Sequence, residues 1–141
     1  MRLFLVFLLA AIGSGGVFAQ GLVGMEKQIL PLTKANWLAF RNYDGQQLVY
    51  FTHLIVYRCG LSEIRYSINS DTLDQRFKLT ACDPQRPNEV PADELPYLSL
   101  PLGSAQTIDV QVVYSDGEAT ETLRFAPCDI ADDGTCAILL E

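Results

Sequence analysis

The chain has 141 residues, of which 49% are hydrophobic and 19% are charged, a composition too apolar for an intrinsically disordered protein. Its 10 Lys and Arg residues against 17 Asp and Glu residues give a formal net charge of −7. Proteins bind nucleic acids and anionic lipids through clusters of Lys and Arg, so this charge argues against both partners and leaves room for a basic one.

Residues 1 to 19 have the three parts of a cleavable signal peptide: a basic start at Arg2, ten apolar residues from 3 to 12, and small residues before a cleavage site at Gln20. Ten apolar residues are too few to cross a bilayer, which needs about 20. We therefore expect an exported protein, periplasmic or secreted, with no membrane span once the signal is removed. The mature chain, residues 20 to 141, then forms a single domain with a formal charge of −8.

Alternating apolar and polar residues predict β-strands along the first half of the mature chain. A strand at residues 37 to 42 is followed by Asp44-Gly45, a pair typical of a tight hairpin turn in which both residues need a positive φ. Residues 46 to 59 are apolar on both faces, and we expect one long central strand there. Residues 61 to 69 have one polar face, and we expect residues 75 to 81 to pair back onto them.

The second half begins with a connection rich in proline, since residues 83 to 101 hold five of the seven prolines of the chain. Proline lacks an N–H donor and fixes φ, so we expect this segment to cross an edge or an end of the sheets. Residues 107 to 114 and 119 to 125 alternate again around a turn at residues 115 to 118 and predict a second hairpin. A last apolar run covers residues 137 to 140.

The mature chain carries four cysteines, an even number that indicates two disulfides in a small exported protein. They are Cys59, Cys82, Cys128 and Cys136. Four cysteines allow three pairings, and the spacing favours one of them. If residues 61 to 69 and 74 to 81 are antiparallel, positions whose numbers add to about 141 face each other, and Cys59 and Cys82 satisfy that register. Cys128 and Cys136 then close a short loop. A zinc site is the alternative, but no two of these cysteines have the C-x₂₋₄-C spacing.

Six or seven short strands joined by turns, with no clear helical stripe, predict an all-β fold. We expect an antiparallel β-sandwich of about seven strands held by two disulfides. A small β-barrel is the alternative.

Two segments, I-R-Y-S-I-N at residues 64 to 69 and V-Q-V-V-Y-S-D-G-E at residues 110 to 118, resemble the immunoglobulin-like and fibronectin-III-like modules attached to bacterial glycan-processing proteins. The resemblance implies an immunoglobulin-like sandwich that serves as a spacer or a binding unit rather than as a catalyst. The whole chain is also similar to small exported proteins of Gram-negative bacteria without an assigned activity. The lack of Asn-x-Ser/Thr glycosylation sites agrees with a bacterial periplasm.

Residues suited to catalysis are few. His53 is the single histidine of the chain and lies inside an apolar run, where we favour a half-buried core residue over a general base. No serine has the G-x-S-x-G motif, and the cysteines are expected to be oxidised. A hydrolase that uses paired carboxylates is the remaining enzymatic hypothesis. We therefore expect a protein that is not an enzyme and needs no cofactor.

The loop between Cys128 and Cys136 is acidic and offers a candidate calcium site. Asp129, Asp132 and Asp133 supply carboxylate oxygens of the kind that bind Ca²⁺. The loop lacks the spacing of an EF-hand, and Asp-rich turns that end in Gly are common without a metal. A bare turn is therefore the alternative.

Two groups of residues are candidates for a binding surface. The first is the stiff apolar segment at residues 97 to 102, with Tyr97, Leu98 and Leu100, which loses little entropy when a partner orders it. The second is an aromatic set near the first hairpin, whose rings suit stacking on sugars or anchoring an interface. Its members are Trp37, Tyr43, Tyr50 and Tyr57. The alternatives are an edge cover for the segment and a place in the core for the rings.

These features leave three functional hypotheses. The first is a non-enzymatic binding or accessory module that contacts an envelope protein or a glycan. The alternative is an inhibitor of a basic hydrolase such as lysozyme, which the small size, the two disulfides and the charge of −8 favour. The mature chain lacks the Ser-Gly pair found in many inhibitors of that kind. The carboxylate hydrolase is the third.

Overall fold

The computed structural model describes residues 22–129 and 134–141. The predicted signal peptide and part of the acidic loop lie outside these residues. In chain order the elements are α1 (Glu26–Ile29), the 3₁₀ helix η1 (Leu30–Asn36), β1 (Ala39–Tyr43), β2 (Gln46–Tyr50), α2 (Thr52–Val56), the 3₁₀ turn η2 (Arg58–Gly60), β3 (Leu61–Ile68), β4 (Gln75–Phe77), β5 (Tyr97–Pro101), β6 (Ile108–Tyr114), β7 (Leu123–Ala126) and β8 (Ile138–Leu140). No helix in the described part of the chain is long and apolar enough to cross a membrane.

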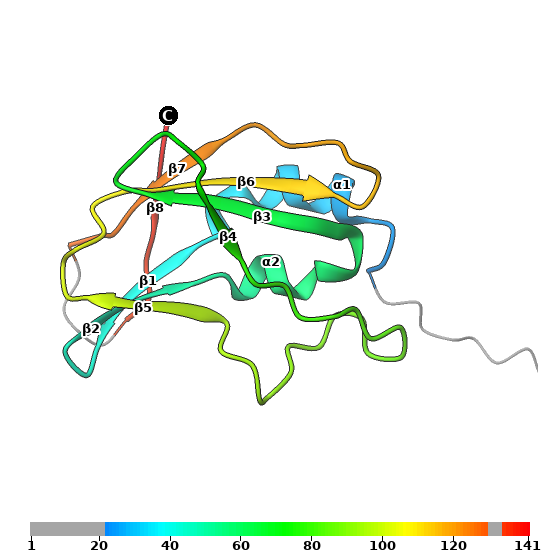
Figure 1. The fold of residues 1–141 in the computed structure, drawn as a ribbon, viewed down its shortest axis with the longest axis horizontal. Coiled ribbons are helices and arrows are strands. Elements are labelled where there is room, and N and C mark those ends of the chain that lie inside the picture. The colour runs from blue at the N-terminus through cyan, green and yellow to red at the C-terminus, as the bar shows by residue number, and fades with distance from the viewer. Residues whose placement is uncertain (1–21, 130–133) are drawn as a thin grey trace, which may run out of the picture.

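Two antiparallel sheets carry the fold (Figure 1). One sheet has three strands in the order β1-β2-β5, and the other has five in the order β4-β3-β6-β7-β8. The mostly β, two-sheet architecture confirms the predicted fold class in outline, although short helices precede β1 and follow β2. The sheets do not close into a barrel, because β4 and β5 are unpaired with each other throughout the described residues.

The β1–β2 hairpin follows the sequence prediction. Asp44 and Gly45 have φ values of 52° and 70°, which is the left-handed conformation that a two-residue turn of this type needs. Tyr43 pairs with Gln46 on either side of the turn, and β2 continues antiparallel to β1 as far as Tyr50. The Asp-Gly pair therefore sets the register of the three-stranded sheet.

The β3–β4 pair confirms the predicted register and the predicted disulfide. Ile64 lies opposite Phe77, and Tyr66 lies opposite Gln75, so the numbers of paired residues add to 141. Cys59 and Cys82, just beyond this pair, are joined as expected. β4 covers only Gln75–Phe77 and is therefore shorter than the strand predicted at residues 75 to 81.

The prediction of one long strand over residues 46 to 59 is wrong. The chain leaves the sheet after Tyr50 and forms α2 and η2 instead. Phe51, Leu54, Ile55 and Arg58 are all buried, and their spacing of three, one and three residues is that of one helix face. An apolar run that few polar residues interrupt is compatible with a buried helix as well as with a buried strand. The alternation of residues therefore does not decide between the two here.

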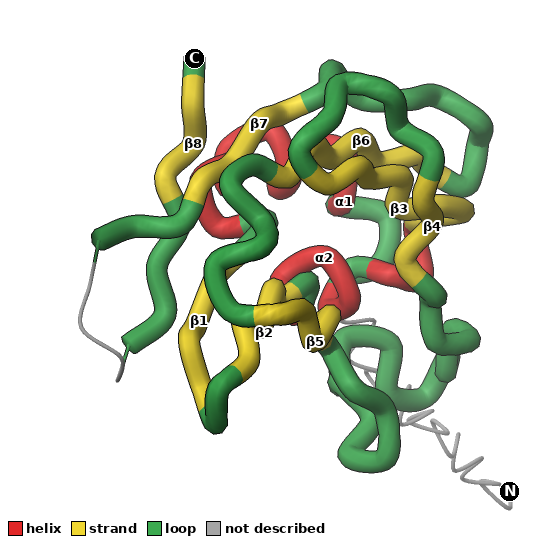
Figure 2. The backbone as a smooth tube through the Cα atoms, turned by 60° about the vertical axis from the view of Figure 1, so that its left-hand side comes forward, coloured by secondary structure: helices red, strands yellow, loops and turns green. Residues whose placement is uncertain are grey.

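The two sheets meet where β1 lies beside Cys136, two residues before β8. The N–H of Phe40 donates to the carbonyl of Cys136 at 2.9 Å, and the N–H of Cys136 donates back at 3.0 Å. Cys136 is bonded to Cys128, which confirms the second predicted disulfide. Figure 2 shows β8 and β1 on the left-hand side of the molecule, while α2 lies near the middle of the view.

One hydrophobic core fills the space between the sheets. Both sheets and the helical segments contribute side chains to it. Its largest fully buried apolar members are Trp37, Phe51, Phe125, Leu30, Leu54, Ile64, Ile108, Val49, Val110 and Val112. Because each sheet turns one face to this core, the outer faces remain for solvent or partners.

His53 joins α2 to η1 through one hydrogen bond. The hydroxyl of Thr33 donates to the carbonyl of Ile29 at 3.0 Å, so its oxygen accepts the proton on Nε2 of His53, 2.9 Å away. Burial lowers the pKa of His53 from its usual 6.5, because a charged imidazolium is poorly solvated there. The folded protein therefore favours the neutral ring.

This lowered pKa predicts a specific loss of stability in mild acid. The unfolded chain binds a proton at His53 more readily than the folded protein, so the free energy of unfolding falls as the pH drops below about 6.5. We expect the loss to stay below about 1 kcal/mol, because the ring is only half-buried and solvent screens the effect. Urea unfolding between pH 7.5 and 5 measures it, and His53→Gln removes this component. An unchanged pH profile in His53→Gln would rule out this role.

Candidate binding surface

The outer face of the three-stranded sheet carries an aromatic cluster. Side chains alternate between the two faces of a strand, and Phe40, Val49 and Leu98 point to the core, so their neighbours point outward. Five outward side chains define what we call the tyrosine face: Arg41, Tyr43, Leu48, Tyr50 and Tyr97. They come from all three strands, and the pairing of the strands places them next to one another on this face.

The side chains of the tyrosine face contact one another closely. The guanidinium carbon of Arg41 lies 4.5 Å from the ring centroid of Tyr43, within the range of a cation–π contact. Tyr50 and Tyr97 meet edge to face with their ring centroids 5.2 Å apart. Leu48 is only 6% exposed although it lies outside the main core cluster. Tyr43 is 56% exposed and lines a shallow hollow with Leu102 at the hairpin tip.

The β5 edge next to this face is free. The N–H of Phe51 donates to the carbonyl of Pro96, and the alternation of an antiparallel ladder then turns Leu98 and Leu100 toward β2. The backbone N–H and C=O groups of Tyr97 and Ser99 point away from β2. No hydrogen bond to the backbone of either residue occurs on that outer side among the described residues. The backbone of Pro101 also points away from β2, so the N–H that proline lacks would not have bonded to β2.

The other sheet edges are protected. The outer side of β1 is bonded to Cys136 at Phe40. The β4 and β8 edges have only three residues each, and β4 carries the charged Arg76. Short length and charge are the usual ways in which proteins prevent strands from pairing at an edge. In the described part of the chain, β5 is therefore the longest edge open to another strand.

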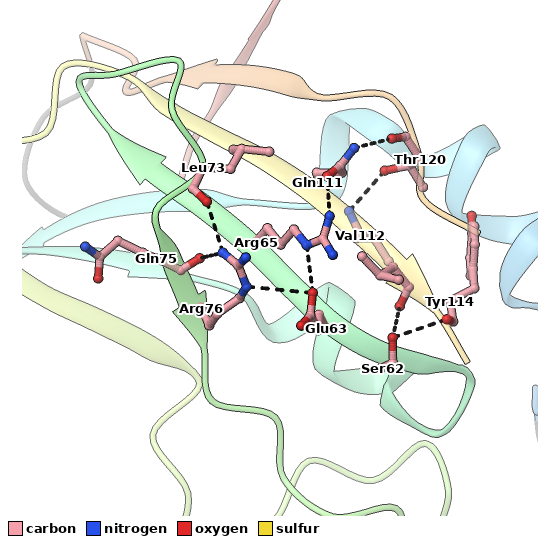
Figure 3. Close-up of polar contacts among 11 residues, drawn as sticks. Ser62, Glu63, Arg65, Leu73, Gln75, Arg76, Gln111, Val112, Tyr114 and Thr120 are labelled. Atoms are coloured by element: carbon pink, nitrogen blue, oxygen red, sulfur yellow. Dashed lines mark hydrogen bonds and ion pairs between the residues drawn. The ribbon is translucent and has the colours of Figure 1, made fainter. Parts of the chain in front are cut away.

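The outer face of the five-stranded sheet differs because its polar groups bond to one another. Arg65 donates to Glu63 at 2.7 Å and to Gln111 at 3.3 Å, and Arg76 lies 3.7 Å from the same Glu63 oxygen (Figure 3). Farther along, Arg124 donates twice to Asp109, at 2.7 and 2.9 Å. These groups are satisfied within the sheet and need no partner.

The structure separates the predicted binding residues into three groups. Tyr43 and Tyr97 lie on the tyrosine face. Leu98 and Leu100 belong to the same edge strand but turn inward and pack against the core. Trp37 is 1% exposed and its indole N–H donates to the carbonyl of Leu30 at 3.0 Å, so it is a core residue and does not join a surface cluster.

The calcium candidate falls mainly outside the described residues. Asp132 and Asp133 lie there, whereas Asp129 is described and exposed. Across residues 22–129 and 134–141, no three His, Cys, Asp or Glu side chains gather in a geometry that could hold a metal. His53 contacts Thr33 and lies edge to face with the ring of Tyr57 at 5.4 Å, a structural setting.

Comparison with protein-family models, with curated proteins and with solved structures found no match to this chain. The proposal below therefore depends on the geometry and chemistry of the tyrosine face and of the β5 edge.

Two members of the tyrosine face, Arg41 and Leu48, were missed by the sequence reasoning. Both occupy alternate positions in the predicted hairpin, so the Asp-Gly turn was enough to align Arg41 with Leu48. The missing signal was which side of the hairpin faces the core. Leu48 lies in a run that is apolar on both faces, so its residue type does not identify the outward side.

Proposed function

We propose that this protein is a non-catalytic, exported binding module that takes an extended segment of another envelope protein as an added strand at β5. The carrying observation is the open β5 edge beside the tyrosine face. Backbone groups of the edge would bond to the added strand, and its outward side chains would contact Tyr97, which Tyr50 of β2 supports from the other side. This arrangement combines affinity from the backbone with selectivity from the rings.

The chemistry of the tyrosine face supports a protein partner. Tyr and Arg are enriched where protein interfaces have their largest binding energies. The outward positions of β1, β2 and β5 include one cation, Arg41, and no carboxylate. A basic hydrolase therefore finds no complementary charge here, which disfavours the inhibitor hypothesis for this surface.

A glycan fits this surface less well than an extended peptide. Sugar rings stack on flat, unobstructed aromatic faces, but Tyr50 and Tyr97 are inclined by 60° to each other. One face of Tyr43 is covered by Arg41. The open backbone groups of Tyr97 and Ser99 instead match the regular spacing of another strand.

Export and an immunoglobulin-like sandwich form part of the same proposal. Disulfides form and persist in oxidising compartments such as the periplasm, and the cysteines of this chain are all paired in the structure. Two antiparallel sheets around one core also suit the binding modules that the sequence resembles.

Ser99→Pro tests the edge directly. Proline removes the outward N–H of Ser99 without removing a backbone bond to β2, and the one side-chain bond lost is the exposed 3.4 Å bond from Ser99 Oγ to Gln46. Proline also requires an extended residue before it, which Leu98 already is. In affinity capture from envelope extract of the source organism, we expect Ser99→Pro to lower partner recovery at least tenfold. Tyr97→Ala should lower it by a similar factor, because a central tyrosine is lost.

Leu140→Ala is the matched control, since Leu140 is 41% exposed and belongs to the outer face of the other sheet. We expect it to capture the partner as the parent protein does. Thermal unfolding of each variant establishes that the fold is retained. Equal capture by the parent, Ser99→Pro and Tyr97→Ala would contradict the proposal, whereas binding only to lysozyme or to oligosaccharides would favour the alternatives.

A further inference from the structure

A buried arginine at the start of η2 lies without a carboxylate partner among the described residues. Arg58 is 3% exposed. Its Nε donates to the carbonyl of Ala81 at 3.2 Å, and its Nη1 donates to the carbonyls of Ile55 and Pro87 at 3.3 and 3.2 Å. Among the described residues, no Asp or Glu oxygen lies within 4.0 Å of this guanidinium. A buried charge ordinarily has a counter-ion, because carbonyl dipoles alone compensate it only in part.

One nitrogen of Arg58 remains available for a ligand. Three hydrogen bonds occupy Nε and Nη1, and none is made by Nη2 in the described part of the chain. Arg58 also lines a hollow of about 350 Å³, which is within the size range of small-molecule sites. Because Nε and Nη1 are bonded to carbonyls, Nη2 is the nitrogen of Arg58 that is left for a ligand in this hollow.

Some of the charged side chains around the hollow form ion pairs with one another, and others do not. Arg86 lies 3.3 Å from Asp83 and 3.6 Å from Glu89, so these three groups largely satisfy one another. Asp93 also lines the hollow, and no cation contacts it within the described residues. An uncompensated cation at Arg58 and an uncompensated carboxylate at Asp93 therefore border the same space. Pro91 and Ala92 supply apolar wall between them.

The wall of the hollow is fixed at several points. The Cys59–Cys82 disulfide joins the residues that directly follow Arg58 and Ala81. The Asn88 side chain donates to the carbonyl of Val56 at 2.9 Å and accepts from the N–H of Leu22 at 2.8 Å. The connection between β4 and β5, which hangs below α2 in Figure 1, is thereby tied to the helix and to the N-terminal segment. Such a site needs little reorganisation on binding.

We propose that this hollow binds a small zwitterion of the amino-acid type, with its carboxylate on Nη2 of Arg58 and its ammonium group at Asp93. Arginine and carboxylate form strong, charge-assisted hydrogen bonds, and Nη2 carries two donors for them. A simple anion is disfavoured because three carboxylates line the same hollow, and a simple cation is disfavoured by Arg58. This site is separate from β5 and does not depend on the function proposed above.

NMR titration tests the proposal on the protein expressed with its own signal and purified with both disulfides formed. The probes are glycine, β-alanine, 4-aminobutyrate and 6-aminohexanoate, whose charge separations increase in steps. We expect at least one to cause saturable shifts at the backbone amides of Ala81, Ala92 and Asp93. Its N-acetyl and its amide derivatives, each with one charge removed, should bind at least tenfold more weakly.

Variants assign the two charges. Arg58→Lys should abolish the saturable shifts, and Asp93→Asn should weaken binding about tenfold while leaving the exposed turn folded. Asp71→Asn is the matched control, because Asp71 is an exposed acid that lines a different hollow. If Arg58→Lys does not fold, Asp93→Asn still decides the outcome. Shifts that do not saturate, an acetylated probe that binds equally well, or unchanged affinity in Asp93→Asn would each overturn the proposal.

Discussion

Phe51→Ala is expected to lower the free energy of unfolding by about 3–5 kcal/mol, the usual cost of removing a fully buried phenylalanine. Phe51 is 0% exposed and stacks on Phe77 of β4 with ring centroids 4.3 Å apart. The ring of Tyr66 in β3 is 5.5 Å away. Phe51 is also the residue at which the chain leaves β2 for α2, so its ring connects both sheets to the helix.

Urea unfolding at pH 7.5 measures this loss. Leu32→Ala is the control, because Leu32 is 86% exposed and its truncation should change the free energy of unfolding by less than about 0.5 kcal/mol. A loss below about 1 kcal/mol in Phe51→Ala would mean that the β2–α2 junction does not pack as the structure has it. Residues 46 to 59 would then have a backbone conformation different from the one in the structure.

Removing the Cys59–Cys82 disulfide has the second largest expected effect. The double substitution Cys59→Ser/Cys82→Ser should lower the free energy of unfolding by about 3 kcal/mol, because the unfolded chain regains the freedom of a 24-residue loop. The same treatment of Cys128 and Cys136 opens a loop of only nine residues and should cost less, about 2.6 kcal/mol by the same relation.

Urea unfolding of the two double variants in parallel tests this order. NMR spectra should show the Cys59/Cys82 variant changed around Ala81 and Pro87, whose carbonyls accept from the adjacent Arg58. Amides of the β1–β2 hairpin should be unaffected, since that hairpin contains neither cysteine. Equal stability of the variant and the parent would show that the disulfide adds nothing to the fold.

Local signals in the sequence predicted the β1–β2 hairpin, the pairing of β6 with β7 and both disulfides, although β7 begins at Leu123 and not at residue 119 as predicted. Asp44-Gly45 has a conformational requirement that few residue pairs meet, so it located the first turn and set the register. The fold-back between β3 and β4 placed Cys59 near Cys82 through the same arithmetic of paired positions. Such predictions succeed because each depends on residues close together in the chain.

Predictions that depended on long-range packing failed. The chain from Thr52 to Val56 is helical because the core takes up Leu54 and Ile55 on one helix face, which alternation could not distinguish from a strand. Trp37 is aromatic and near the hairpin, but it is buried and its indole N–H donates to the carbonyl of Leu30 in η1, a packing that alternation does not reveal. The tyrosine face was found in part, since Tyr43 and Tyr97 share it while Leu98 and Leu100 turn inward.

Amide hydrogen exchange along β5 tests the central claim most directly, namely that this edge is open and receives a partner strand. In the free protein, the amides of Tyr97 and Ser99 should exchange fast, while those of Leu98 and Leu100, which bond to β2, should be protected. Binding of the captured partner should slow exchange at Tyr97 and Ser99. Uniform protection of all four amides in the free protein, or fast exchange at Tyr97 and Ser99 that persists in the complex, would contradict the account.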